Sequence, residues 1–533
     1  MRKHFLVTLT SILLVCCMIW LGTRRAEHIM LDRHIDILRQ SLGQGVFLTY
    51  DSARSGLLGR STVFTNVIFR RKNDTITVQQ AELSRPDSNN MSGINHLSFH
   101  NVQITGVDGN LKAELLTIDD LVLLPHGQKQ ARTIRLPSIA HAHAYGVRGF
   151  IKALHAQIAA DSVTLDHFNG TITDQLLIKN ILLSVNTGTW RRFTIKTTHA
   201  SGFNIAKLYW SLYHGIPLYN GVPTTAQPGQ RDIEMHQIEI DGETTNQSGT
   251  TPTPSTTPLL RISNLSSHIT LTKALEQETS NIQGIEIWPI TPGFHWIAPL
   301  KYDHLHASID FNNSDNLQTK LLHVKDLNIT VPTIGRMRFH GDFTHSPIHF
   351  SMSSPLEFST YSPISPILSR ISPDVQIAFP DIYVVSMAFT YFDYGFITRA
   401  LKAMATESHT TPHHLLETLF PGISLDPLPI APKEQKESLA QTTLTDIHTV
   451  RELNLGTEKT SVDTSHTPPS DNALQKIADY LAHPTSRYLV INSHPAQPFS
   501  VQSILSTLST KRNSLGEVLP QIAQKIGLSV TEP

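Results

Sequence analysis

Short segments in which apolar and polar residues alternate recur through most of this chain, and they limit the folds open to it. Examples are 75–78 (TITV), 163–165 (VTL) and 337–339 (MRF). A period of two places one set of side chains on a core and the other in water, as in a half-buried strand. Gly, Asn, Asp, Ser and Pro, the common turn residues, separate the segments. We therefore predict a mainly β, antiparallel body from residue 44 onward.

One six-residue form recurs among these segments: apolar, any, Asn or Asp, apolar, any, apolar. It is centred on Asn66, Asn101, Asn180 and Asp326, and its first half occurs at Asn264. Apolar residues three apart break strict alternation, so one extra residue has entered the strand. Asn and Asp suit such a bulge because they tolerate unusual backbone angles. The form predicts similar strands stacked in a long sheet; the alternative is chance matches in a β-protein of this composition.

Residues 5–22 (FLVTLTSILLVCCMIWLG) form an uncharged apolar run with basic residues at 2–3 and 24–25. Its length falls at the short end of the range for a membrane-spanning helix. Charge follows where a signal peptidase would need small residues, and Val15 rather than a small residue precedes Cys16. We therefore expect an uncleaved signal anchor, and not a cleaved signal peptide or a lipoprotein signal.

Basic residues on both sides of the run do not decide its orientation, but long domains cross membranes largely regardless of charge. We expect a single pass through a bacterial inner membrane with the body in the periplasm. Cys16 and Cys17 are the chain's two cysteines, so the body has neither a disulfide nor a thiolate site. A formal net charge of −1 provides no electrostatic footprint for nucleic acid.

The chain divides by composition into an anchored, β-rich body with two polar interruptions. Helices are expected at 26–42, 205–214, 396–405, 413–420, 472–481, 501–508 and 515–526. The expected divisions are an anchor and stalk helix (1–43), a β-rich block (44–241), a flexible linker or loop (242–258), a β-rich block ending in helices (259–430), a disordered insert (431–471) and a C-terminal helix-strand-helix region (472–533).

Four segments carry sequence motifs that resemble known proteins: 50–59 (YDSARSGLLG), 387–405 with its Asp393-x-Gly turn, 473–484 and 488–498. They resemble uncharacterised, N-terminally anchored periplasmic β-rich proteins of Gram-negative bacteria. More distantly the chain is similar to AsmA-like proteins. That resemblance implies an elongated, curved antiparallel sheet behind a transmembrane helix, with a short α+β region at the C-terminus. It also implies an apolar groove that carries lipid between membranes.

Histidine is frequent, at 28 copies, and two His-x-His pairs (His141 and His143, His304 and His306) could each present two metal ligands. His413 and His414 are adjacent. A zinc site needs three or four convergent ligands, and the spacing shows only pairs. A compositional habit is therefore preferred, and we assign no metal ligand. As a hypothesis, the histidines would add positive charge to the body below about pH 6.5.

Other candidate residues have a structural interpretation that we prefer. Asp119 and Asp120 are expected to form a turn before 121–124 and not a catalytic carboxylate pair. Asp393 is expected to shape a strand-to-helix turn, with Arg399 facing solvent or pairing with it, and not to act as a catalytic acid. The aromatic residues Tyr209, Trp210, Trp288, Phe294 and Trp296 could line a lipid or carbohydrate site but are more often core residues.

No phosphate-binding loop or hydrolase motif appears, so no catalytic, cofactor-binding or metal residue is assigned. The sequence favours a non-enzymatic protein of the cell envelope that handles lipid or maintains the outer membrane, with lipid or an envelope protein as its partner beyond the bilayer itself. The alternatives are a scaffold that binds another protein through a sheet edge or loops, and an envelope hydrolase. A continuous apolar sheet face would favour the first.

Overall fold

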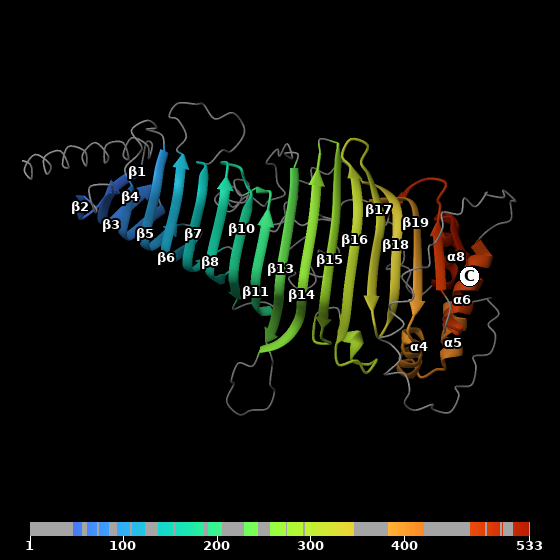
Figure 1. The fold of residues 1–533 in the computed structure, drawn as a ribbon. Helices are drawn as coiled ribbons and strands as arrows, with labels where there is room; N and C mark the ends of the chain where they lie inside the picture. Colours follow the sequence, from blue (N-terminus) through green and yellow to red (C-terminus); the bar gives the residue numbers. More distant parts are fainter. Residues whose placement is uncertain are drawn as a thin grey trace, which may run out of the picture. The chain divides into compact units, whose positions relative to one another are not determined.

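The computed structural model describes most of the β-rich body and a C-terminal α+β region (Figure 1). It describes residues 46–55, 61–71, 74–84, 93–106, 109–122, 137–152, 155–185, 190–204, 229–243, 256–272, 274–291, 294–345, 382–420, 470–484, 488–500, 504 and 515–531. The chain forms two compact units, one comprising residues 1–331 and 345–380 and the other 332–344 and 381–533.

The first unit is one large open antiparallel sheet, which confirms the sequence prediction of a mainly β, antiparallel body. Its strands are β1 (Val46–Thr49), β2 (Ser52–Ser55), β3 (Ser61–Arg71), β4 (Asp74–Ser84), β5 (Gly93–Gly106), β6 (Gly109–Val122), β7 (Ile139–Ile151), β8 (Ala156–Phe168), β10 (Gln175–Val185), β11 (Trp190–Ser201), β13 (Gly229–Glu243), β14 (Thr256–Leu271), β15 (Leu275–Ile287), β16 (Leu305–Asn316) and β17 (Leu321–Val331). The short strands β9 (Ile172–Thr173) and β12 (Phe203–Asn204) pair with each other in a separate small sheet.

The order of the strands is a simple meander. Both β1 and β2 pair with β3, and from β3 each strand pairs with the next one along the chain until β17, except that β8 pairs with β10 and β11 with β13. Figure 1 shows these strands side by side in sequence order. Strands β13 and β14 pair although residues 244–255 lie between them, so the sheet continues across the expected linker.

The second unit combines strands and helices. It contains β18 (Gly335–His345), β19 (Ile382–Asp393), β20 (Tyr488–Ser493), β21 (Phe499–Ser500), β22 (Leu528–Thr531), α4 (Phe396–Glu407), α5 (Pro412–Leu419), α6 (Ser470–Ala482) and α8 (Leu515–Lys525). Strand β19 pairs with β20 and β21, and β20 with β22, all antiparallel. Leu416 from α5 and Tyr480 from α6 are fully buried in its core.

The described helices agree closely with the sequence expectations for 396–405, 413–420, 472–481 and 515–526. Helix α5 illustrates the cause: Pro412 occupies its first turn, where no backbone donor is needed, and the Thr411 hydroxyl accepts a hydrogen bond from the His414 N–H at 3.2 Å. The expected anchor (5–22), the stalk helix (26–42), the helix at 205–214 and the insert up to residue 469 lie outside the described residues, as does nearly all of 501–508. The last two residues of the expected insert, Ser470 and Asp471, are instead helical and begin α6. Among the helices described, none has the length and apolar character needed to cross a bilayer.

Candidate functional site

A row of left-handed residues crosses the first unit's sheet and explains the recurrent six-residue form. Asn66, Asn101 and Asn180 have φ angles of 49°, 53° and 53°, as the form predicted for its Asn positions. Gly146 (63°), Gln237 (51°) and Gly284 (62°) occupy the same place on other strands. These residues lie on alternate strands of the sheet. On each strand in between, the register matches them with a single residue. From β3 to β16 the row, which we call the crease, consists of Asn66, Gln79, Asn101, Glu114, Gly146, Asp161, Asn180, Lys196, Gln237, Ser263, Gly284 and Ser308.

The prediction of an ordinary bulge needs correction at most of these sites. Asn66 lies between the pairs Thr65↔Gln80 and Val67↔Val78, so it is matched one to one by Gln79. Each neighbouring strand carries its own extra residue, and the ladder therefore continues without a shift. A register shift occurs at Gly284, on β15 between Ile282 and Ile285.

The remaining two matches to the form behave differently. Asp326 stands at a separate register shift between β16 and β17, so the irregularity predicted there is confirmed. At Asn264 the extra residue is confirmed, because Ile262 and Leu265 lie on the same apolar face although they are three apart, but the crease passes through the neighbouring Ser263.

Side chains of the crease hold its strands together on the polar face. Asn101 donates from Nδ2 to Gln79 Oε1, and Asn180 from Nδ2 to Asp161 Oδ2, each at 2.5 Å. Asn66 makes the equivalent bond to Asp51 Oδ2 at 2.6 Å. An amide side chain at a left-handed position thus also bridges to a neighbouring strand, a second reason for Asn at these sites.

The opposite face of the sheet is apolar on both sides of the crease. The row on one side is Phe64, Ala81, Phe99, Leu116, Ala144, Val163, Ile178, Thr198, Met235, Leu265, Ile282 and Ile309. The row on the other side is Val67, Val78, Val102, Ala113, Val147, Ala160, Ile181, Ile195, Ile238, Ile262, Ile285 and Ala307. A third row is Phe69, Ile76, Ile104, Leu111, Gly149, Ile158, Leu183, Phe193, Ile240, Leu260, Ile287 and Leu305. We call these three rows the apolar face.

Burial differs along the apolar face. Toward β14 and β15 its residues are closed off, with Leu260, Ile282 and Ile285 each 1% exposed. On β5 and β6, Ile104 and Leu111 are each 37% exposed and are direct cross-strand partners. The accessible part of the apolar face therefore includes this cross-strand pair.

A polar patch interrupts the apolar side near β14 to β16. Glu278 is 1% exposed, and its Oε1 accepts hydrogen bonds from Ser280 Oγ at 2.7 Å and Ser267 Oγ at 3.3 Å. The Asn313 side-chain amide donates to Oε2 at 3.5 Å. Buried carboxylates need such partners, so this patch is a satisfied polar cluster within the sheet.

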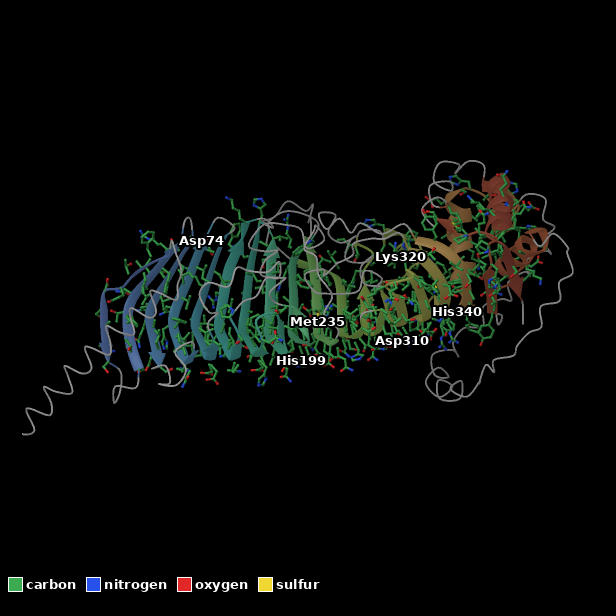
Figure 2. All side chains as sticks on the ribbon, turned by 90° about the horizontal axis from the view of Figure 1, so that it is seen from above. Asp74, His199, Met235, Asp310, Lys320 and His340 are labelled. Carbon is green, nitrogen blue, oxygen red and sulfur yellow. The ribbon has the colours of Figure 1, made fainter. Side chains whose placement is uncertain are left out.

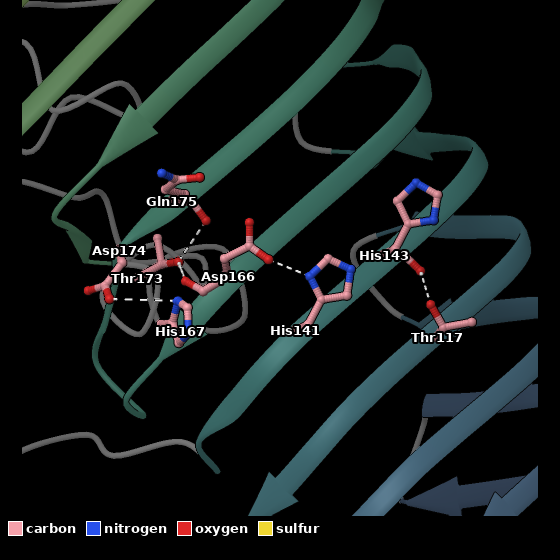
Figure 3. Close-up of polar contacts among 8 residues, drawn as sticks. All are labelled: Thr117, His141, His143, Asp166, His167, Thr173, Asp174 and Gln175. Carbon is pink, nitrogen blue, oxygen red and sulfur yellow. Dashed lines mark hydrogen bonds and ion pairs between the residues drawn. The ribbon is translucent and has the colours of Figure 1, made fainter.

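The other face carries the polar side chains, among them those of His199 and Asp310 (Figure 2). Met235 belongs instead to the apolar face, and its side chain is 2% exposed. A ladder of imidazoles and carboxylates crosses part of this face. Its members, His96 on β5, Asp119 on β6, His141 on β7 and Asp166 on β8, are directly paired in register. His96 Nδ1 lies 2.5 Å from Asp119 Oδ1, and His141 Nδ1 bonds to Asp166 Oδ1 (Figure 3).

The same arrangement recurs at Asp232 on β13, which bonds to His268 on β14 and accepts from Ser201 Oγ at 2.8 Å. Burial raises the pKa of the Asp232 carboxyl. Hydrogen bonds from His268 and Ser201 and the charges of His268 and His199 outweigh burial, so the pKa is lowered from its ordinary value of 3.8. Many of the histidines thus have partners on the sheet surface, and their pairing with carboxylates is a structural role that composition alone did not indicate.

The two His-x-His pairs have different outcomes. His141 bonds to Asp166, while the backbone carbonyl of His143 accepts from Thr117 Oγ1 at 3.4 Å (Figure 3). Among the described residues, only His304 and His306 converge with a third side chain that could ligate a metal, Glu286.

His413 and His414 lie on α5 and both approach Glu417, at 3.8 Å and 3.3 Å. Their neighbouring carboxylate is thus on their own helix. They do not belong to the group of three potential ligands found elsewhere in the described part of the chain.

The predicted turn at Asp119 and Asp120 is wrong, because both residues lie within β6. Asp120 has a φ of 49°, and the register matches it to Ala140 on β7. On the other edge of β7, the register pairs Ala140 with His167 of β8, which has a φ of 48°. These residues form a second, shorter left-handed row. The polar character that suggested a turn reflects a backbone that Asp tolerates better than most residues.

Asp393 is a structural residue of the strand-to-helix turn, as expected. Its carboxylate is buried and accepts hydrogen bonds from the Gly395 N–H at 2.8 Å, the Ile397 N–H at 3.1 Å and the Tyr391 hydroxyl at 2.8 Å. Arg399 is exposed and donates from Nε to the Gly395 carbonyl at 3.3 Å. Burial, and then the Asp393 charge, raise the pKa of nearby Tyr480 to about 12.

Of the aromatic residues that the sequence suggested for a ligand site, Trp288, Phe294 and Trp296 are described, and they lie near β15 and β16. Trp288 stacks on His304 with ring centroids 5.5 Å apart, and the Arg261 guanidinium lies 5.5 Å from the Trp288 ring centroid. Phe294 and Trp296 contact each other at 6.4 Å. Tyr209 and Trp210 lie outside the described residues.

These features define a class of protein: an open, antiparallel meander sheet with one polar and one apolar face. No family model matches the chain, and no curated protein matches it either. The assignments below therefore rest on the residues and their geometry.

Proposed function

We propose that this protein is a non-enzymatic lipid-handling protein of the bacterial cell envelope, in which the apolar face holds acyl chains. The observation that supports the proposal is that three rows from β3 to β16 are apolar apart from Thr198 and Gly149. With about 4.8 Å between strands, the rows extend for about 50 Å. A path of that length suits a chain-like apolar ligand better than a compact substrate.

The chemistry of the apolar face supports the same proposal. Apolar surface left accessible at Ile104 and Leu111 disfavours water and favours hydrocarbon, by about 25 cal/mol per Å² removed from water. The described carboxylates and imidazoles of the first unit lie mainly on the opposite, open polar face, as the ladder from His96 to Asp166 does. Catalysis would instead require convergent groups from which water is excluded.

The cellular setting is part of the proposal. Residues 5–22 would anchor the chain in the inner membrane, with the body in the periplasm, and the resemblance to AsmA-like proteins is consistent with an elongated, curved sheet used as a lipid path. The lipid bilayer would be the partner of the anchor, and an acyl-chain lipid the ligand of the apolar face. No cofactor is required for such a role.

Site-specific photo-crosslinking tests the proposal. A photoreactive amino acid is placed at Ile104 or Leu111 in the full chain, and matched controls carry it at Gln103 or Lys112. Each control is the sequence neighbour of a test position, so its side chain points to the opposite, polar face. On β5, a hydrogen bond between the side chains of Gln103 and Thr105 shows that these two residues share one face. After irradiation in native membranes, adducts are identified by mass spectrometry.

We expect lipid adducts at Ile104 and Leu111 and few at the controls. Equal adduct yields on both faces, or no lipid adduct on either, would contradict the proposal. Protein adducts at the test positions would instead support a scaffold that binds an envelope protein. Native extraction of the full chain followed by lipid mass spectrometry gives an independent measure, and a lipid-free preparation would count against lipid handling.

A further inference from the structure

Glu286, His304 and His306 bring three potential metal ligands together at the junction of β15 and β16. The register places Glu286 directly opposite His306. His304 comes two residues before His306, just ahead of the first residue of β16. One ligand atom from each side chain lies within 4.8 Å of the other two. Since adjacent strands hold these residues, the arrangement depends on the sheet and not on a flexible loop alone.

The two imidazoles face each other through the same ring nitrogen. Their Nε2 atoms are 2.8 Å apart, and the rings are inclined at 69°. In tetrahedral zinc coordination, with Zn–N bonds of 2.0–2.1 Å, two ligand nitrogens are about 3.3 Å apart. A separation increase of about 0.5 Å would therefore let both lone pairs bind one ion. Glu286 Oε1 lies 3.7 Å from the other ring nitrogen of His306, Nδ1, and a carboxylate oxygen of Glu286 lies within 4.8 Å of a ring nitrogen of each imidazole.

Neighbouring side chains restrict the imidazole of His304. The Trp288 ring stacks on it at 5.5 Å with an interplanar angle of 19°. Arg261 in turn lies over Trp288. Such support fixes the orientation of a ligand before the ion binds, which lowers the entropy that binding must overcome.

From this geometry we propose that Glu286, His304 and His306 bind a borderline divalent cation, with Zn²⁺ as the best fit. Two imidazoles and one carboxylate are a ligand set that zinc accepts, and three protein ligands leave one coordination position for water or another molecule. Magnesium and calcium are disfavoured because they prefer oxygen ligands. The site lies at the β15–β16 junction and does not depend on the lipid-handling proposal.

The test is a Zn²⁺ titration of the full chain in competition with a chromophoric chelator. The variants His304→Asn, His306→Asn and Glu286→Gln each remove one ligand. His268→Asn is the matched control, because His268 is also a half-exposed strand histidine that bonds to a carboxylate on the neighbouring strand, but its second ring nitrogen contacts Thr270 and not another imidazole. Cobalt absorption provides a second readout of the same ligands.

We expect the three ligand variants each to weaken binding of one Zn²⁺ per chain by at least about 100-fold, the upper end of what loss of a supporting residue costs. The His268→Asn variant should bind like the wild type. Cobalt should give ligand-field bands that the ligand variants lose. Unchanged binding in the two histidine variants would overturn the site, and unchanged binding in Glu286→Gln would overturn its three-ligand composition. Circular dichroism without metal verifies that every variant is folded.

Discussion

Replacing Gly284 with alanine tests whether the crease is a backbone requirement. Gly284 has a φ of 62°, which side chains other than those of Gly, Asn and Asp rarely adopt. A Cβ atom added there would stand 2.3 Å from Ser263 Oγ and 2.7 Å from Ser263 Cβ on the adjacent strand. Alanine at this position therefore meets both a strained backbone and a steric conflict.

The two effects set the expected magnitude. A left-handed conformation costs an L-residue about 1–2 kcal/mol. Crowding of a packed position costs about 1–3 kcal/mol, and the Ser263 side chain can give way only in part because the conflict includes its Cβ. We expect Gly284→Ala to lower the free energy of unfolding by about 3 kcal/mol.

The matched control is Gly229→Ala in β13. An added Cβ at Gly229 has no heavy atom within 4 Å, and its φ is outside the left-handed region. Alanine there should be neutral or stabilise the protein by about 0.5–1 kcal/mol, because it restricts the unfolded chain. Both variants are compared with the wild type by urea-induced unfolding, with the slope checked for constancy.

A third variant separates the two causes. Gly284→Asn keeps the steric conflict with Ser263 but uses the residue that occupies the crease at Asn101 and Asn180, so it should lose less stability than Gly284→Ala. If Gly284→Ala were as stable as Gly229→Ala, the claim that the crease depends on left-handed backbone would be refuted.

Three further substitutions test other parts of the structure by the same unfolding measurement. Because the pKa of Asp232 is lowered in the folded protein from its ordinary value of 3.8, its stabilising contribution is present above that value and is lost as pH falls through the folded value. Asp232→Asn should therefore destabilise the protein at pH 6, and its difference from the wild type should shrink as pH falls below 3.8. Asp393→Ala leaves three donors without their acceptor and should cost about 3 kcal/mol, while Asp393→Asn, which keeps a carbonyl oxygen, should cost clearly less; equal costs would argue against the turn role. Ile195→Ala, at a side chain 2% exposed on the apolar face, should cost about 2–5 kcal/mol, against less than about 0.5 kcal/mol for Thr194→Ala on the other face, and similar losses would contradict the assignment of faces.

Local patterns in the sequence predicted the type of fold and part of the crease. Alternation predicted the strands, and the six-residue form predicted unusual backbone at Asn66, Asn101 and Asn180. The form could not find Gly146 or Gln237, because it was defined by Asn or Asp. A left-handed residue is set by backbone geometry, and several residue types can satisfy that geometry once the neighbouring strands impose it.

The candidate metal site could not be predicted, because its decisive ligand comes from another strand. His141-x-His143 and His304-x-His306 have the same spacing, and only the second pair meets a third possible ligand, Glu286. Nineteen residues lie between Glu286 and His306 in the sequence, and the register alone sets them opposite each other. Cross-strand partners depend on turn lengths and bulges, which spacing within one strand does not encode.

The crease and the apolar face depend on each other. In a regular strand, residues three apart point to opposite faces, so Phe64 and Val67 would be separated by the sheet. The left-handed Asn66 between them restores both to one side, where they belong to the same hydrophobic cluster as Val78 and Ala81 of the next strand. If only one strand carried the extra residue, its register with the next would shift, as it does between β15 and β16, where β16 carries none. Because every strand from β3 to β15 carries one in the same row, the pairing continues unbroken along this row from β3 to β15. The repeated irregularity is therefore what allows one face to remain apolar along the entire row of strands, and the lipid-handling proposal rests on that continuity.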